Sequence, residues 1–329
     1  MRFPGNRIVK TAVAVFLTAL LCELIGWPPV FAVITAIVTL EPTVSDSIKK
    51  GIIRFPASAI GSFYAVLFIA FFGNSPVTYT LAAALTIITC YQLKLHDGLL
   101  VATITAVAMI EVVYDHYLMS FLIRLGTTTI GIVVSTLVNL LIFPPNFMKE
   151  INENIRNTYN DIGHALLALM SRNDKKIHTH ITKVDKGIGR IERLVRFESS
   201  DVEYFRLEDK KQSALTRVTK TLERLRFIQY HVNNLRIISL DDTSFDHTTK
   251  QRILRIITDL AHFMIGKTET IPFGHEKYLR EIMEWYWNSS HLPKEEAVNE
   301  LPTELVLLYE LISIFYLVEE MVEQKNNTN

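Results

Sequence analysis

Two glutamate–arginine pairs stand with the same spacing in the apolar part of this 329-residue sequence. Glu41 precedes Arg54 by thirteen residues, and Glu111 precedes Arg124 by thirteen residues. A guanidinium removed from water binds carboxylates strongly, often through two parallel hydrogen bonds. A buried carboxyl group can carry a proton, because burial favours its neutral form. The four residues are therefore candidates for an anion path in which Glu41 or Glu111 carries a coupling proton.

The segments that contain these pairs repeat along the chain at an offset of seventy residues. AVITAIVTLE (32–41) and ATITAVAMIE (102–111) share five of ten residues, and both end on the glutamate. IRFPASAIG (53–61) and IRLGTTTIG (123–131) follow in the same register and align the two arginines. Similar Ala, Ile and Val content could produce some matches by coincidence, but it does not explain the aligned charges. We therefore predict an internal repeat.

Each copy of this repeat would hold three membrane crossings. Because three is odd, the second copy must be inverted relative to the first. Inverted repeats are an architecture of secondary transporters, whose solute site lies near the midplane where the copies meet. Gly61 and Gly131 also align, and the small residues around them predict close helix packing at both positions.

Structural roles compete with the anion path for each of the charged residues. Arg54 follows Lys49 and Lys50, so its side chain could be an anchor that reaches the lipid headgroups. Arg124 is the eighth residue of its apolar segment, where an arginine is costly in lipid and should face protein, water or an anion. Either pair could also be an ion pair that only holds helices together. The transport interpretation requires Arg124 to face a water-filled path shared by the two copies.

Charge is unevenly distributed along the chain. Residues 1–146 hold only eight of the 34 Lys and Arg residues and six of the 34 Asp and Glu residues. A bilayer core about 30 Å thick requires about 20 apolar helical residues. Six segments qualify or nearly qualify as crossings: 8–25, 28–41, 48–72, 77–93, 98–113 and 117–143. We therefore predict a six-helix integral membrane domain in residues 1–146.

The apolar runs that end at Glu41 and Glu111 are short. Each holds fourteen residues, and a helix of that length spans about 21 Å, less than the bilayer core. Unusually short segments at matching places in two repeats point to a transport site.

The basic residues between the apolar segments predict the orientation, because short cytoplasmic loops are enriched in Lys and Arg. The loops after the first, third and fifth segments carry none. The other side holds Arg2, Arg7, Lys10, Lys49, Lys50, Lys94 and Lys149. We expect a multi-pass protein of the cell membrane with both termini in the cytoplasm.

Residues 147–329 have the apolar period of amphipathic helices and predict an antiparallel cytosolic bundle. The fold class is therefore all-α, with a membrane domain at 1–146 and a helical domain at 147–329. The sequence holds no phosphate-binding loop, dinucleotide motif or metal-ligand cluster. Acidic residues balance the basic helices, which argues against nucleic acid as a partner. We expect no cofactor, no metal and no catalysis, and we expect Cys22 and Cys90 to pack in helices.

Several of these features together resemble the fusaric-acid-resistance and aromatic acid exporter superfamily. They are the six apolar segments, Glu-Pro-Thr after the second, an arginine followed by small residues and glycine in the third and sixth, and a Pro-Pro exit. The compact form is similar to a bacterial branch with six transmembrane helices and a C-terminal cytosolic helical domain. The resemblance implies export or conduction of organic anions past Arg54 and Arg124, and it implies a homodimer.

Two functions follow as hypotheses. The first is a secondary exporter or channel for small organic carboxylates, with aromatic ones implied by the resemblance. Its energy would come from a membrane potential or proton gradient, because the sequence has no ATPase motif. The second is a non-transporting membrane anchor whose cytosolic bundle acts as a scaffold or sensor for a partner protein.

Overall fold

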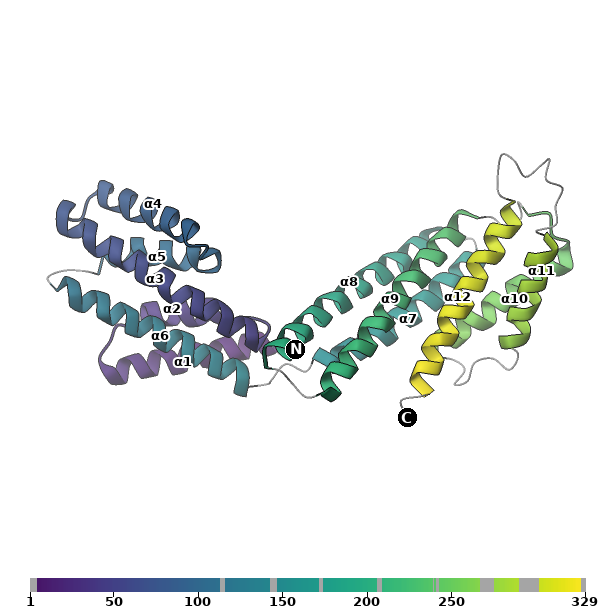
Figure 1. The fold of residues 1–329 in the computed structure, drawn as a ribbon, viewed down its shortest axis with the longest axis horizontal. Coiled ribbons are helices and arrows are strands. Elements are labelled where there is room, and N and C mark those ends of the chain that lie inside the picture. The colour runs from purple at the N-terminus through teal and green to yellow at the C-terminus, as the bar shows by residue number, and fades with distance from the viewer. Residues whose placement is uncertain are drawn as a thin grey trace. The chain divides into compact units, whose positions relative to one another are not determined.

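The structure, a computed structural model, describes residues 5–112, 116–142, 147–171, 174–205, 209–238, 240, 243–266, 275–289 and 302–326. Every regular element in these ranges is helical, so the predicted all-α class is confirmed (Figure 1). The first half contains α1 (Asn6–Ile25), α2 (Val30–Thr39), α3 (Val44–Phe72), α4 (Pro76–Gln92), η1 (His96–Gly98), α5 (Leu99–Ile110) and α6 (Tyr117–Leu141). The second contains α7 (Phe147–Met170), α8 (Asp174–Phe205), α9 (Asp209–Ile237), α10 (His247–Met264), α11 (His275–Ser289) and α12 (Thr303–Asn326).

The chain forms two compact units. The first comprises Met1–Asn146 with Ser200–Leu207, and the second comprises Phe147–Ser199 with Glu208–Asn329. The predicted boundary at residue 146 assigns Ser200–Leu207 to the helical domain instead of the membrane domain. These residues count with the first unit, where Ser45 donates its backbone N–H to Asp201 Oδ1 at 2.9 Å. The Pro-Pro exit at 144–145 lies outside the described residues.

Turn residues end the helices of the first unit where the sequence breaks its apolar runs. Gly26 ends α1 with a φ of 78°, in the left-handed region that favours glycine. The Thr43 hydroxyl accepts from the backbone N–H of Asp46 and caps α3. Ser75 caps α4 in the same way, and Pro76 occupies its first position, where no N–H donor is needed.

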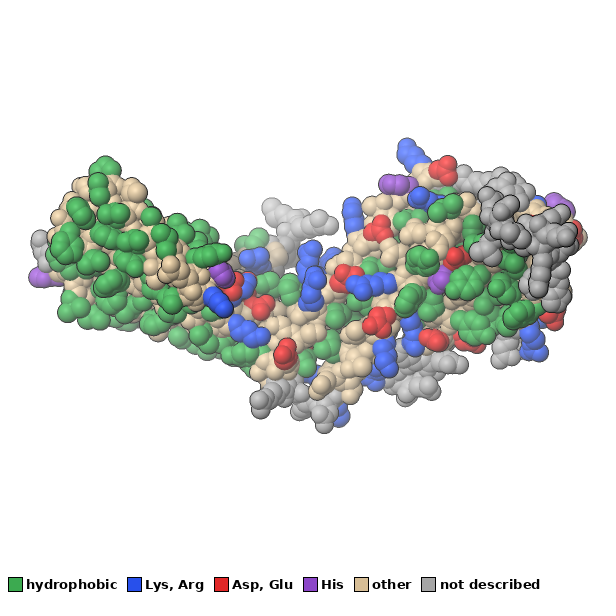
Figure 2. Space-filling model, turned by 45° about the horizontal axis from the view of Figure 1, so that its top comes forward, with side chains coloured by type: hydrophobic (Ala, Val, Ile, Leu, Met, Phe, Trp, Pro, Cys, Tyr) green, Lys and Arg blue, Asp and Glu red, His purple; other side chains and the backbone are tan. Residues whose placement is uncertain are grey.

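The outer surface of the first unit is apolar. Leu24, Phe71 and Leu118 are each more than 70% exposed. Figure 2 shows hydrophobic side chains over much of the visible face of this unit. Exposed apolar surface on this scale is unfavourable in water and is expected of helices that face lipid. The first unit is therefore a membrane unit.

Three of its described helices are long and apolar enough to cross a bilayer. They are α3, α6 and the Arg7–Ile25 part of α1. Apolar helices at Val30–Thr39 and His96–Ile110 are shorter. These are the helices that precede Glu41 and Glu111, and α2 with its ten residues spans only about 15 Å. Six crossings remain a prediction.

The second unit is an amphipathic helical bundle. Its core contains one large cluster of aliphatic side chains, in which Ile191, Leu225, Ile256 and Leu308 are fully buried. Helix α7 packs against α9 and α10, and α12 packs against α9 and α11 (Figure 1). Close approach of α7 and α10 depends on Gly163, since a Cβ there would lie 2.7 Å from the carbonyl oxygen of Ala261.

Candidate functional site

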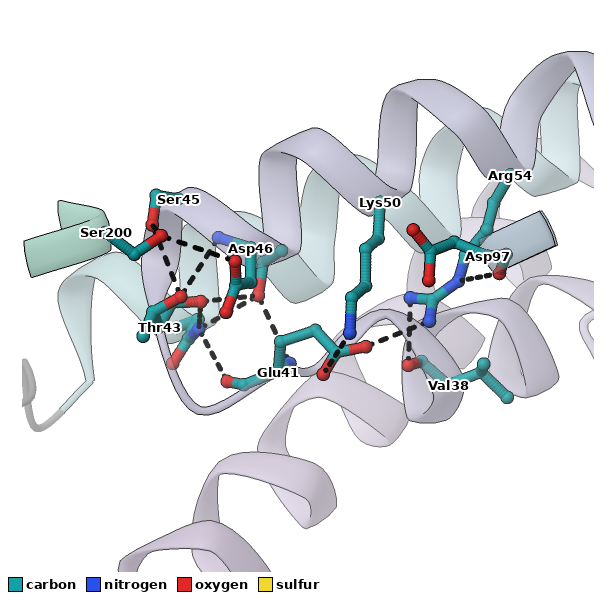
Figure 3. Close-up of polar contacts among 11 residues, drawn as sticks. Val38, Glu41, Thr43, Ser45, Asp46, Lys50, Arg54, Asp97 and Ser200 are labelled. Carbon is teal, nitrogen blue, oxygen red and sulfur yellow. Dashed lines mark hydrogen bonds and ion pairs between the residues drawn. The ribbon is translucent and has the colours of Figure 1, made fainter. Parts of the chain in front are cut away.

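Arg54 of α3 lies among oxygen acceptors beside the α2–α3 connection (Figure 3). Its Nη2 donates to Glu41 Oε1 at 2.9 Å, and its Nη1 donates to the carbonyl of Val38 at 3.0 Å. Its Nε donates to the carbonyl of Asp97 at 3.3 Å. Lys50 Nζ lies 3.3 Å from the second oxygen of Glu41. Arg54 is only 6% exposed, so the headgroup-anchor alternative is wrong for this residue.

The connection that carries Glu41 is fixed by further polar contacts. Asn139 Nδ2 of α6 donates to the carbonyls of Glu41 and Thr43 at 3.0 and 3.1 Å. The same amide donates to Ser47 Oγ at 3.0 Å. Lys10 Nζ of α1 donates to Asn139 Oδ1 at 2.8 Å. Residues from α1, α3 and α6 thus hold this connection in place.

Arg124 of α6 is also buried, but no carboxylate of the described residues balances its charge. Its Nη2 donates to Thr105 Oγ1 of α5, and its Cζ lies 4.4 Å from the centroid of the Phe31 ring of α2. Its Nε and Nη1 have no hydrogen-bond acceptor in the part of the chain that the structure describes. Donors left unpaired in this way carry a desolvation cost that an anion would offset.

Protein surrounds this guanidinium in the structure. The side chain of Arg124 is 3% exposed, and it lies against residues of α2 and α5. The transport hypothesis requires Arg124 to face a water-filled path, and Arg124 does not line one among the described residues, whereas the scaffold hypothesis allows a closed bundle. The described residues show an enclosed site.

Hydroxyl groups from both predicted copies meet beside Arg124. Ser58 Oγ lies 3.2 Å from Thr128 Oγ1 and 3.5 Å from Thr105 Oγ1. Ser58 and Thr128 are seventy residues apart and are therefore equivalent positions of the repeat. The first predicted copy contributes Phe31 and Ser58. The second contributes Thr105, Arg124 and Thr128. The candidate site thus lies where the two predicted copies meet.

The glycines of the repeat lie at two very close helix contacts. A Cβ on Gly61 would lie 2.2 Å from the carbonyl oxygen of Ala102. A Cβ on Gly131 would lie 2.5 Å from the carbonyl oxygen of Ala32. Ala32 and Ala102 are themselves seventy residues apart, so each glycine meets the same position of the other copy. Such reciprocal contacts are expected of two copies related by a two-fold axis.

Glu111, the fourth candidate, does not join Arg124. It follows α5 on the exposed surface of the unit, where it accepts a hydrogen bond from the hydroxyl of Tyr79 in α4. No hydrogen bond or ion pair connects Glu111 to Arg124 within the described residues. The ion-pair alternative is therefore realised for Glu41 and Arg54, and it is wrong for the second pair in this structure.

Comparison with known proteins places the chain in a family. Over 329 residues it is 44% identical to the UPF0421 protein of Oceanobacillus iheyensis, covering 97% of this chain and 95% of that protein. The chain belongs to the UPF0421 family. A Bacillus cereus member is 40% identical over 327 residues, covering 96% and 92% of the two chains. A Staphylococcus aureus member is 31% identical over 326 residues and covers 96% of each.

A second match concerns the membrane unit of this UPF0421 protein. Residues 2–142 match the model of aromatic acid exporter family member 1. The match confirms the resemblance to aromatic acid exporters, and it covers all four candidate site residues. Together with the apolar surface of the first unit, the match points to a membrane protein.

Sequence reasoning missed the polar contacts of several residues in this unit. Ser58 and Thr128 were expected only to pack helices beside the two glycines, although both are hydroxyl residues at equivalent positions of the predicted repeat. Lys10 could also have been noticed as a charge inside the helical part of the first crossing. Phe31 and Tyr79 carried no signal, since one aromatic side chain in an apolar helix is ordinary.

Proposed function

We propose that this protein moves small organic carboxylates, aromatic ones foremost, across the cell membrane through a site at Arg124. The observation that carries the proposal is a buried arginine in a membrane unit that has two unpaired nitrogens and no carboxylate partner among the described residues. Removing this charge from water costs free energy, and an anion bound at Arg124 would offset that cost. Phe31 beside the guanidinium offers an apolar surface to an aromatic ring.

In this proposal the membrane unit has six crossings in two inverted three-helix repeats, with both termini in the cytoplasm. Helices α2 and α5 are the short elements at matching places that flank the site. The enclosed Arg124 then corresponds to an occluded state between inward and outward access. A negative cell interior favours export of an anion by about 2.3 kcal/mol per charge per 100 mV.

Arg124→Met is expected to lower transport strongly while leaving the fold intact. Methionine keeps much of the apolar volume of arginine, and removing a buried charge relieves its desolvation cost, which offsets the lost contacts with Thr105 and Phe31. In proteoliposomes loaded with benzoate, 4-hydroxybenzoate or malate, we expect carboxylate efflux to fall at least about tenfold, the effect of losing one hydrogen bond to a charged group. Arg124→Lys should retain partial activity, because it keeps the charge but loses the planar fork.

Arg7→Ala is the matched control, since it removes an exposed arginine from α1 of the same unit. Its efflux should equal that of the wild type. The proposal is wrong if the wild type moves no carboxylate of the panel under any imposed potential or pH gradient. A much lower unfolding temperature in Arg124→Met would also contradict it, because the arginine would then be structural. Either result would favour the membrane-anchored scaffold.

A further inference from the structure

The two glutamate–arginine pairs have the same spacing in the sequence and different partners in the structure. Arg54 has all three of its nitrogens hydrogen-bonded, and its charge is paired with Glu41. Arg124 has two nitrogens without an acceptor in the described ranges, while its equivalent glutamate is bound to Tyr79. The first pair shows that a glutamate thirteen residues before the arginine can reach it.

Side chains near the two glutamates explain why only the first pair forms. Lys50 contacts Glu41 and lies four residues before Arg54 on the same helix. The equivalent position in the second copy is Ser120, which adds no positive charge. Conversely, Tyr79 holds Glu111, and the equivalent position in the first copy is Val9, which cannot donate a hydrogen bond from its side chain. In the second copy, the pair of Glu111 with Arg124 therefore lacks the support of a nearby lysine, and Glu111 has Tyr79 as an alternative partner.

The helix that carries Arg124 also begins differently. Helix α3 begins at Val44, whereas α6 begins at Tyr117, three positions later in the register of the repeat. The α2–α3 connection is fixed by Asn139, and the equivalent position in the first copy is Ile69, whose side chain has no polar group.

We propose that Glu111 is an internal competitor of the transported anion. In the arrangement described here Tyr79 holds Glu111, and Arg124 is left for the anion. In a second arrangement Glu111 releases Tyr79 and pairs with Arg124, as Glu41 pairs with Arg54, so that Glu111 and the anion compete for the same guanidinium. This exchange lowers the affinity of Arg124 for the anion and favours release of the anion.

This inference rests on the proposed function and adds two roles to it. Arg124 binds the anion, whereas Glu111 and Tyr79 set how tightly it is bound. The prediction has a definite sign, because removing a competitor must strengthen binding. A glutamate that only stabilises the protein would have no such effect.

The test measures the half-saturating benzoate concentration for efflux from proteoliposomes that contain the full chain. Glu111→Gln should lower this concentration several-fold, since the competing charge is gone. Tyr79→Phe should raise it roughly tenfold, the effect of losing one hydrogen bond to a charged group. Glu23→Gln is the matched control, an exposed glutamate near the end of α1, and should leave it unchanged.

The double variant Glu111→Gln/Tyr79→Phe separates the proposed exchange from unrelated effects. It should behave as Glu111→Gln alone, because Tyr79 acts only through Glu111. The benzoate-induced rise in unfolding temperature should follow the same order among the variants, which gives a second readout without transport. If the wild type transports benzoate but Glu111→Gln binds it no more tightly, the competitor role is refuted and the proposed function stands. If the wild type neither binds nor transports benzoate, both fall together.

Discussion

Replacing Gly61 with leucine is expected to prevent the membrane unit from folding. Even the first atom of a side chain, Cβ, would lie 2.2 Å from the carbonyl oxygen of Ala102, and that backbone atom cannot move without shifting α5. Overpacking of a well-packed interior typically costs about 1–3 kcal/mol, and a displaced helix adds to this. Gly61→Leu should therefore yield aggregated protein, with no monodisperse peak by size-exclusion chromatography in detergent.

Position 70 of the same helix supplies the control. Ala70 lies on the exposed side of α3, so Ala70→Leu adds nearly the same apolar bulk, three carbons instead of four, without a clash. Its unfolding temperature and elution should match those of the wild type. Gly131→Leu should fail as Gly61→Leu does, because its Cβ would lie 2.5 Å from the carbonyl oxygen of Ala32. Normal folding of both glycine variants would show that these helix contacts are not as close as described.

Removing the carboxylate of Glu310 should destabilise the second unit by about 2–6 kcal/mol, because two buried hydrogen-bonding groups lose their acceptor at a cost of about 1–3 kcal/mol each. Glu310 of α12 is 5% exposed and contacts His231 Nδ1 of α9, and its other oxygen accepts from Asn234 Nδ2 at 2.9 Å. Glu310→Ala leaves both of these donors without their acceptor inside the bundle. Hydrogen–deuterium exchange of α9 and α12 in the full chain should then be faster by roughly a hundredfold or more.

Glu320 provides the comparison for this prediction, because it lies on the same helix and also pairs with α9. Its Oε2 lies 2.9 Å from Arg224 Nε, but its side chain is 55% exposed. Solvent screens such a pair, so Glu320→Ala should cost no more than about 1 kcal/mol. Equal exchange rates in the two variants would mean that burial adds nothing to the Glu310 interaction.

Much of the fold could be predicted because apolar run length and period are properties of the sequence. The predicted segments 8–25, 48–72 and 117–143 correspond closely to α1, α3 and α6. Helices α2 and α5 are shorter than their apolar runs, since residues 28–29 and 40–41 lie outside α2, and residues 98 and 111–112 lie outside α5. Helix-forming and apolar residues extend beyond the ends of these helices in the sequence. The end of a helix itself depends on local contacts, such as the cap that Thr43 provides for α3.

The sequence by itself determined that Glu41, Arg54, Glu111 and Arg124 stand at equivalent places of a repeat, because spacing along a chain needs no structure. Only the tertiary structure decided which arginine is neutralised. That outcome depends on side chains from other helices, Lys50 beside Glu41 and Tyr79 beside Glu111, whose approach is set by helix packing. The same packing encloses Arg124 against Phe31, a contact that the positions of these two residues in the sequence do not predict.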